Sequence, residues 1–212
     1  MSAVSRISTG SEDQTGGTTR FYDKRGSEYF SQTIDIDMSA IYRRFLIYLK
    51  PGAVILDAGS GSGRDTRAFL SLGYDVEAFD ASRTLAALSS RFTGVQTQVL
   101  RFQEFRSPKQ YDGIWCCAAL LHVPRSALED AMSRLFAALK PGGVMYASFK
   151  LGDAERIADD GRRFTDIDAD DLTRMIGRIT PSVKIAELWQ TSGESGSQGD
   201  NAWLNVIFQR TD

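Results

Sequence analysis

Hydrophobic positions along the chain after Phe21 follow two alternating periods. Short apolar runs that predict buried strands are each followed by a stretch in which apolar residues recur every three or four positions, as on one face of a helix. The expected strands cover 53–58, 74–79, 95–100, 113–118 and 144–149. The expected helices between them cover 64–72, 82–92 and the stretch from Ser126 to Pro141. This alternation predicts parallel strands joined by helical crossovers.

The C-terminal part of the chain changes this pattern. A helix is expected over 169–179, where apolar residues share one face. Two further strands, 183–189 and 203–209, flank a loop rich in Ser and Gly and have no helix between them, so they should pair antiparallel. The predicted fold is therefore α/β: a Rossmann-like, doubly wound, seven-stranded and mostly parallel sheet with an antiparallel C-terminal hairpin strand.

The N-terminal segment is different in composition. Residues 1–20 are dominated by Ser, Thr and Gly, so we expect them to form a disordered tail outside the fold. The stretch 38–49 has apolar residues at helical spacing and predicts an amphipathic helix before the first strand. Because 212 residues suit one sizeable core, residues 21–212 are expected to form a single domain that begins with a helical segment, 21–50.

Composition and charge narrow the possible partners. The formal net charge is −2 and Lys and Arg are scattered, so we expect no nucleic-acid partner. Cys116 and Cys117, the only cysteines, are adjacent in an apolar run, which disfavours a disulfide or a metal site and suits a reducing compartment. No apolar stretch approaches the roughly 20 residues of a membrane span, and no signal peptide is recognisable. We expect a cytoplasmic monomer or homodimer without a membrane or metal partner.

The sequence ILDAGSGSGRD, residues 55–65, joins the first expected strand to the next helix through a glycine-rich loop. In a doubly wound sheet, ligands bind beside such a loop. A nucleoside-triphosphate loop is excluded because no lysine follows the glycines. A dinucleotide loop, G-x-G-x-x-G, is disfavoured because Arg64 or Thr66 stands at the place of its third glycine. The remaining pattern, D-x-G-x-G-x-G, is formed by Asp57, Gly59, Gly61 and Gly63.

This pattern resembles the first motif of class I S-adenosylmethionine-dependent methyltransferases. The strand YDVEAFD ends in Asp80, 23 residues after Asp57, where the family has a carboxylate that holds the cofactor's ribose. YDGIWCCAALLHV resembles the family's fourth strand and its exit, and LKPGGVMYASFK resembles the turn into its fifth strand. The segments FYDKRGSEY, GSGSGRD, LLHVP and SFK bring the chain closest to small, single-domain methyltransferases of the tellurite-resistance type.

The resemblance implies S-adenosylmethionine as cofactor, S-adenosylhomocysteine as its product, and in-line methyl transfer to a small acceptor of soft or oxyanion-like character. The cofactor-binding residues that it implies are Tyr22, Tyr29, Asp57, Gly59, Gly61, Gly63, Asp80, Ala81, Phe102 and Cys117. Among these, Asp57 would act through its charge and through hydrogen bonds to the loop or the methionine amine. Tyr22 and Tyr29 would close over the methionine end, and Cys117 and Ala118 would line the pocket after the fourth strand.

The adenine end of the expected site departs from the family pattern. After the third strand the family often has an acidic residue that accepts the adenine amino group, whereas this chain has Arg101 there. Phe102 could contact adenine through its ring and its backbone N–H, or Glu104 could accept the amino group instead.

His122, the only histidine, follows the fourth strand at a place where a general base would serve an acceptor with a hydroxyl or amine. We take it as the candidate catalytic residue. Two other functions remain open from the sequence: a protein that binds a nucleoside cofactor without transferring a group, and an NAD-dependent oxidoreductase.

Overall fold

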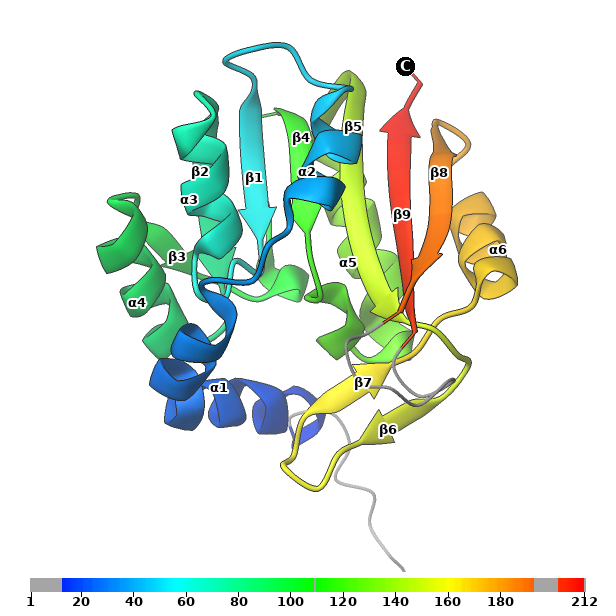
Figure 1. Ribbon diagram of the computed structural model, residues 1–212. Helices are drawn as coiled ribbons and strands as arrows, with labels where there is room; N and C mark the ends of the chain where they lie inside the picture. The colour runs from blue at the N-terminus through cyan, green and yellow to red at the C-terminus, as the bar shows by residue number, and fades with distance from the viewer. Residues whose placement is uncertain (1–12, 109, 193–201, 212) are drawn as a thin grey trace, which may run out of the picture.

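The computed structural model describes residues 13–108, 110–192 and 202–211. Its centre is a seven-stranded sheet in the order β3-β2-β1-β4-β5-β9-β8 (Figure 1). The strands are β1 (Val54–Ala58), β2 (Asp75–Asp80), β3 (Thr97–Val99), β4 (Tyr111–Cys116), β5 (Leu139–Lys150), β8 (Val183–Thr191) and β9 (Trp203–Arg210). The first five pair in parallel, and β9 runs antiparallel between β5 and β8. The predicted fold class is confirmed.

Helices cover both faces of this sheet. They are α1 (Asp13–Thr33), α2 (Ser39–Leu46), α3 (Arg64–Ser71), α4 (Arg83–Thr93), α5 (Arg125–Ala137) and α6 (Ala169–Ile179), with two short 3-10 turns, η1 (Phe102–Glu104) and η2 (Leu120–His122). α2 and α3 pack on one face, and α5 and α6 pack on the other (Figure 1). The helices expected at 64–72, 82–92 and 169–179 agree with α3, α4 and α6 to within one residue at each end.

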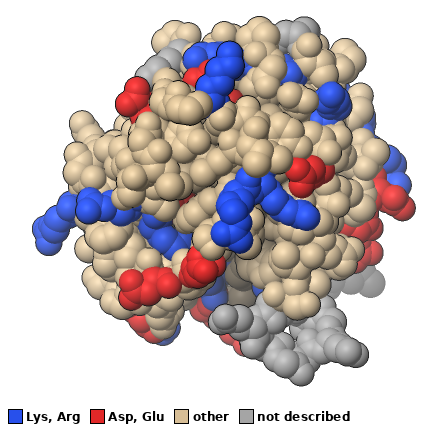
Figure 2. Space-filling model, turned by 45° about the horizontal axis from the view of Figure 1, so that its top comes forward, with Lys and Arg blue, Asp and Glu red and all other residues tan. Residues whose placement is uncertain are grey.

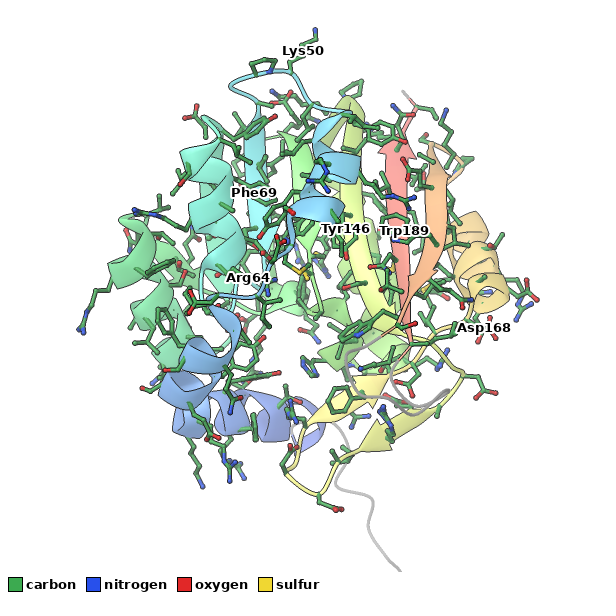
Figure 3. The ribbon with its side chains drawn as sticks, in the orientation of Figure 1. Lys50, Arg64, Phe69, Tyr146, Asp168 and Trp189 are labelled. Carbon is green, nitrogen blue, oxygen red and sulfur yellow. The ribbon has the colours of Figure 1, made fainter. Side chains whose placement is uncertain are left out.

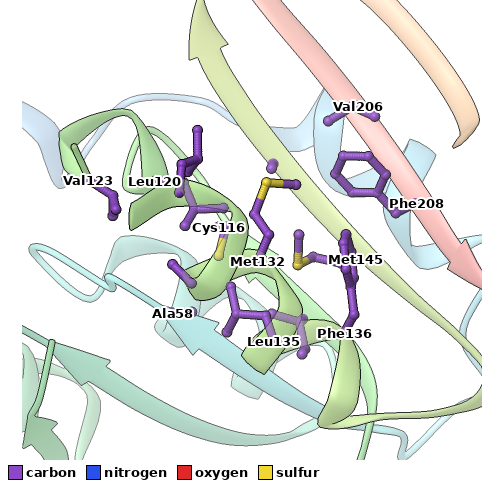
Figure 4. Close-up of a cluster of buried hydrophobic side chains, with 14 of the residues drawn as sticks. Ala58, Cys116, Leu120, Val123, Met132, Leu135, Phe136, Met145, Val206 and Phe208 are labelled. Carbon is purple, nitrogen blue, oxygen red and sulfur yellow. The ribbon is translucent and has the colours of Figure 1, made fainter. Parts of the chain in front are cut away.

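The core lies on both faces of the sheet and fixes the strand ends that carry the site. Buried hydrophobic side chains form two clusters, one on each face, and the larger one lies on the side of α5. It contains Met132 and Phe136 of α5, and the ring of Phe136 packs edge to face on that of Phe208 of β9 (Figure 4). On the other face, Trp115 of β4 stacks on Tyr146 of β5, with ring centroids 4.1 Å apart. Close-packed side chains on both sides leave the strands little freedom to shift.

The N-terminal helix is longer than expected. α1 begins at Asp13, so residues 13–20, which we expected outside the fold, belong to it, while residues 1–12 lie outside the described part of the chain. Thr18 is 9% exposed, and its hydroxyl oxygen accepts a hydrogen bond from the backbone N–H of Arg163 at 2.9 Å. This tertiary contact outweighs the weak helix propensity of Gly and Thr, which is why composition alone misplaced the segment.

The structure contains a second, two-stranded sheet that the sequence did not lead us to expect. β6 (Glu155–Ile157) and β7 (Arg163–Thr165) pair antiparallel after β5. The sequence contains one indication of this hairpin, the Asp-Asp-Gly stretch at 159–161, which is typical of a turn between two strands. In the structure Gly161 has a φ of +85°, which glycine adopts readily.

The carboxyl edge of the parallel strands is where the connecting segments meet. The strand order reverses between β1 and β4, which both leave the sheet at this edge. α1 and the β6–β7 hairpin cross below it, at the bottom of Figure 1. Doubly wound sheets bind ligands at this switch point, so the loops after β1, β2 and β4 are the place to look for a site.

The outer surface mixes charges of both signs. On the face in Figure 2, Lys and Arg side chains stand among Asp and Glu side chains. None of the helices in the described ranges combines the length and apolar character that crossing a membrane requires.

Candidate functional site

A cavity opens at the switch point of the sheet. Its walls come from the loops after β1, β2 and β4, from η1 and from α1. The predicted site residues that line it are Tyr22, Tyr29, Gly59, Gly61, Asp80, Ala81, Phe102, Cys117 and His122. The structure therefore brings together residues from five separate parts of the sequence.

The glycine loop forms one wall of this cavity with bare backbone. Gly59 has a φ of +78°, and a Cβ atom there would lie 2.5 Å from the Cβ of Ala119. At Gly61 a Cβ would lie 3.3 Å from a ring carbon of Tyr29. The backbone N–H groups of Gly59 and Ser60 both donate to the carbonyl oxygen of Phe79, at 2.9 and 3.0 Å. These bonds tie the loop to the end of β2, and the missing side chains let a ligand approach closely.

Asp80, the last residue of β2, places a buried carboxylate next to this loop. It is 9% exposed, and its two oxygens accept the backbone N–H groups of Gly61 at 2.9 Å and Ser82 at 2.8 Å. Burial raises the pKa of Asp80 to about 6, although these two hydrogen bonds act in the opposite direction. Each oxygen keeps a lone pair beyond its backbone bond, so the group can accept from hydroxyls of a ligand.

α1 is held over the cavity by contacts to the start of α4. A carboxylate oxygen of Asp23 accepts the hydroxyl of Ser82 at 2.7 Å and the backbone N–H of Thr84 at 3.3 Å. Tyr22 and Tyr29, on the same helix, have ring centroids 5.0 Å apart and both line the cavity. Burial raises the pKa of both hydroxyls, so they are neutral at ordinary pH.

His122 ends η2 and faces Tyr22 across the cavity. Its Nδ1 lies 2.6 Å from the carbonyl oxygen of Arg163, and its Nε2 lies 3.0 Å from the Tyr22 hydroxyl oxygen. Because a carbonyl oxygen only accepts, Nδ1 must carry the proton of the neutral ring. Burial lowers the pKa of His122 to about 4, so the ring is neutral above that pH.

Residues 31–193 match the family model of a methyltransferase domain. The chain belongs to this family. Among curated relatives of this methyltransferase, a 24-methylenesterol C-methyltransferase of Arabidopsis thaliana is 29% identical over 58% of the chain. A ubiquinone biosynthesis O-methyltransferase of Xanthomonas campestris is 35% identical over 46% of it. The chain spans 36% and 43% of the lengths of these two relatives.

Solved structures show how widely the methyltransferase fold is shared. The 1,6-didemethyltoxoflavin-N1-methyltransferase of Burkholderia thailandensis, with S-adenosylhomocysteine and 1,6-didemethyltoxoflavin bound, has a TM-score of 0.73 at 20% identity; the match covers 98% of this chain and 94% of that one. Magnesium protoporphyrin IX methyltransferase of Synechocystis, with S-adenosylmethionine bound, has a TM-score of 0.70 at 15% identity over 97% and 100% of the two chains. At these identities the likeness is one of fold.

Asp57 of this methyltransferase lies behind the cavity and is absent from its lining. It is 2% exposed, and one of its oxygens accepts the hydroxyl of Thr66 at 2.6 Å. Burial and the nearby carboxylate of Asp65 raise its pKa. Its side-chain contact in the structure is Thr66, through which it supports the start of α3; contact with the loop or with the methionine amine of a cofactor stays a prediction.

Gly63 is likewise absent from the lining of the cavity. It precedes α3 with a φ of +80°, and a Cβ there would lie 2.6 Å from the Ser89 hydroxyl oxygen and 2.9 Å from a Thr93 methyl carbon. The third glycine of the motif thus serves the packing of α3 against α4.

Replacing Gly63 with alanine tests this packing role. Overpacking costs about 1–3 kcal/mol and a positive φ costs alanine about 1–2 kcal/mol, so we expect a loss of about 2–5 kcal/mol in the free energy of unfolding. Gly73→Ala is the matched control, because Gly73 has a φ of +86° and open space around it. Gly73→Ala should therefore lose only the part of the free energy of unfolding that the positive φ costs alanine. Urea unfolding measures both, and equal losses would contradict the packing role.

The part of the cavity where the resemblance implies adenine is formed by η1. Phe102 and Gln103 line it, whereas Glu104 uses a carboxylate oxygen to accept the backbone N–H of Arg101 at 3.1 Å. Glu104 is thereby engaged in capping the turn and is absent from the cavity lining. Of the two alternatives from the sequence, the geometry favours Phe102, and it adds Gln103, whose polar side chain sequence reasoning did not single out.

Arg64 and Asp65, the first two residues of α3, form a buried cluster. Asp65 is 6% exposed and accepts the Arg64 Nε–H at 2.7 Å, the Trp115 indole N–H at 2.8 Å and the Tyr42 hydroxyl. Arg64 lies at the start of α3, below the end of β1 (Figure 3), and its Nη2 reaches the Cys117 sulfur at 3.8 Å. The cluster thus connects the glycine loop to both α2 and β4.

The buried state of His122 predicts a pH dependence of stability. The unfolded chain binds a proton at His122 near pH 6.5, whereas the folded chain does so only near pH 4. The unfolded state therefore holds more protons between these values, and stability falls as the pH decreases through this window, by up to about 1.4 kcal/mol per unit. His122→Gln should lack this component. Urea unfolding from pH 4 to 8 checks it: the difference between the two proteins should change below pH 6.5, and a constant difference would contradict the expectation.

Proposed function

We propose that this methyltransferase transfers a methyl group from S-adenosylmethionine to a small molecule by in-line displacement. The observation that carries the proposal is the buried Asp80 carboxylate beside the bare backbone of Gly59 and Gly61, at the switch point of the sheet. Membership of the methyltransferase family supports the reaction class. The relatives named for ubiquinone, toxoflavin and magnesium protoporphyrin support a small acceptor.

The residues around the cavity fit the proposed cofactor. A ribose has two neighbouring hydroxyls, and Asp80 has two carboxylate oxygens with lone pairs left over. The glycine loop offers a cradle that a Cβ at Gly59 would fill.

When bound, S-adenosylmethionine supplies a methyl group that is already electrophilic because it is attached to a positively charged sulfur. The protein then has to hold the nucleophile in line with the bond to that methyl group and exclude water. Such positioning can contribute up to roughly 7–11 kcal/mol to lowering a barrier. Tyr22 and Tyr29, on α1, supply the walls that exclude water at this end of the cavity.

The covering of the cavity favours a small acceptor. Thr18 of α1 bonds the backbone of Arg163 in β7, so the helix and the hairpin form a joined cover. The guanidinium of Arg162 lies 4.4 Å from the ring centroid of Phe21 and adds a second connection between them. Such a joined cover favours a small acceptor over a polymer.

Methyl transfer is tested with S-adenosylmethionine labelled in its methyl group and a panel of small acceptors. The panel contains phenols, amines and nitrogen heterocycles, with selenite and tellurite added because of the resemblance to tellurite-resistance enzymes. We expect labelled product from at least one class. Tight binding of S-adenosylhomocysteine without transfer would favour a binding protein, and stabilisation by NAD instead would favour an oxidoreductase.

A further inference from the structure

The methyl-transfer end of the cavity contains a hydrogen-bonded pair whose direction the structure fixes. Nδ1 of His122 donates to the Arg163 carbonyl oxygen at 2.6 Å, so Nε2 has a free lone pair. The Tyr22 hydroxyl, 3.0 Å away, must then donate its proton to Nε2. The carbonyl is held in place by β7, whose Arg163 N–H donates to Thr18 on α1.

This direction determines what the cavity offers to a ligand. With its proton directed at His122, the Tyr22 oxygen can only accept a hydrogen bond from a molecule in the cavity. Arg162 also hydrogen-bonds this hydroxyl and lowers its pKa against the effect of burial. The Tyr22 hydroxyl can therefore transfer its proton to Nε2 of His122, and the positive charge of Arg162 stabilises the negative charge that develops on the Tyr22 oxygen.

We propose that Tyr22 and His122 form a proton relay and that the cavity therefore selects a methyl acceptor that carries a hydrogen on its reacting oxygen or nitrogen. The inference rests on the proposed function of the same site. As the acceptor heteroatom bonds to the methyl carbon, the carbon–sulfur bond breaks and its electron pair stays on sulfur. The acceptor's proton passes to the Tyr22 oxygen, and the proton of Tyr22 passes to Nε2 of His122.

The charge balance of this step suits a buried histidine. Burial keeps His122 neutral before the reaction and so available as a base. The positive charge on sulfur disappears in the same step in which the imidazolium forms. The net charge of the cavity is therefore the same before and after transfer, and the relay moves a positive charge instead of creating one in a buried place.

The single histidine makes the direction of the relay measurable without a known acceptor. In protein labelled with ¹⁵N-histidine, the imidazole of His122 gives the only histidine signals. We expect a neutral ring with its proton on Nδ1, and a shift of the Nε2 signal in Tyr22→Phe. A proton on Nε2 would overturn the relay, because Tyr22 would then donate to the ligand. Binding of S-adenosylhomocysteine in the same samples tests the proposed function separately.

Activity provides the second test. For a phenol or amine acceptor, general acid–base catalysis typically contributes 10²–10⁴-fold, so Tyr22→Phe should lower kcat by about 10²-fold or more. The KM for S-adenosylmethionine should change little, and adding His122→Gln should cause no further loss, since the two residues act as a unit. Tyr48→Phe is the control, because Tyr48 bonds Glu187 away from the cavity. An unchanged kcat in Tyr22→Phe, or transfer to selenite and tellurite alone, would overturn the proposal.

Discussion

Replacing Asp80 with alanine is expected to weaken binding of S-adenosylhomocysteine by about a hundredfold. Hydrogen bonds to a charged group contribute about 1.5–3 kcal/mol each, and about 1.4 kcal/mol corresponds to tenfold in affinity. Two ribose hydroxyls on one carboxylate therefore account for a loss of this size. The variant also frees the backbone N–H groups of Gly61 and Ser82, which loosens the glycine loop. Calorimetric titration measures the effect.

Two further variants sharpen this test. Asp80→Asn keeps the shape and one acceptor oxygen, so it should fall between the wild type and Asp80→Ala. Asp75→Ala is the matched control, because Asp75 is the exposed first residue of the same strand, at the opposite end from the cavity. An affinity of Asp80→Ala within threefold of the wild type would show that the ribose lies elsewhere.

The largest effect on stability is expected from Asp65→Ala. Removing this carboxylate leaves the Arg64 guanidinium, whose side chain is 16% exposed, without its ion-pair partner. It also leaves the Trp115 N–H and the Tyr42 hydroxyl without their acceptor. Breaking a buried ion pair by removing one partner costs about 3–5 kcal/mol, mostly because a charge stays buried alone. Urea unfolding should show a loss of this size.

The double variant Arg64→Ala/Asp65→Ala separates the two causes of that loss. If the unpaired charge of Arg64 dominates, the double variant should be more stable than Asp65→Ala alone. Asp75→Ala again serves as the control for removing an exposed carboxylate. A loss below about 1 kcal/mol in Asp65→Ala would mean that the cluster is solvated and does not hold α3 to α2 and β4.

The alternation of strands and helices could be predicted because its physical cause is local. Apolar runs such as 113–118 and helices such as 169–179 show their period within a few residues, and crossover helices leave parallel pairing as the solution. The loop between the last two strands contains no helix, which predicted the antiparallel pair β8 and β9. The β6–β7 hairpin was missed because its strands are only three residues each.

The site was predicted in part because a motif shows which residues occur together and not which way their side chains point. Asp57 and Gly63 belong to the same motif as Gly59 and Gly61, yet they contact Thr66 and α4. Asp65 lies at the end of the same motif, and its partners, Tyr42 and Trp115, are remote in sequence. Contacts of this kind depend on packing between distant segments, which no local pattern records.

A crystal structure of the full chain with S-adenosylhomocysteine tests the account most directly. We predict that the ribose hydroxyls lie within hydrogen-bond distance, about 2.5–3.2 Å, of the Asp80 carboxylate oxygens. The adenine should contact Phe102, and the sulfur should face Tyr22 and His122. A ligand whose ribose lies away from Asp80, or whose sulfur faces away from the Tyr22–His122 pair, would contradict the proposed site.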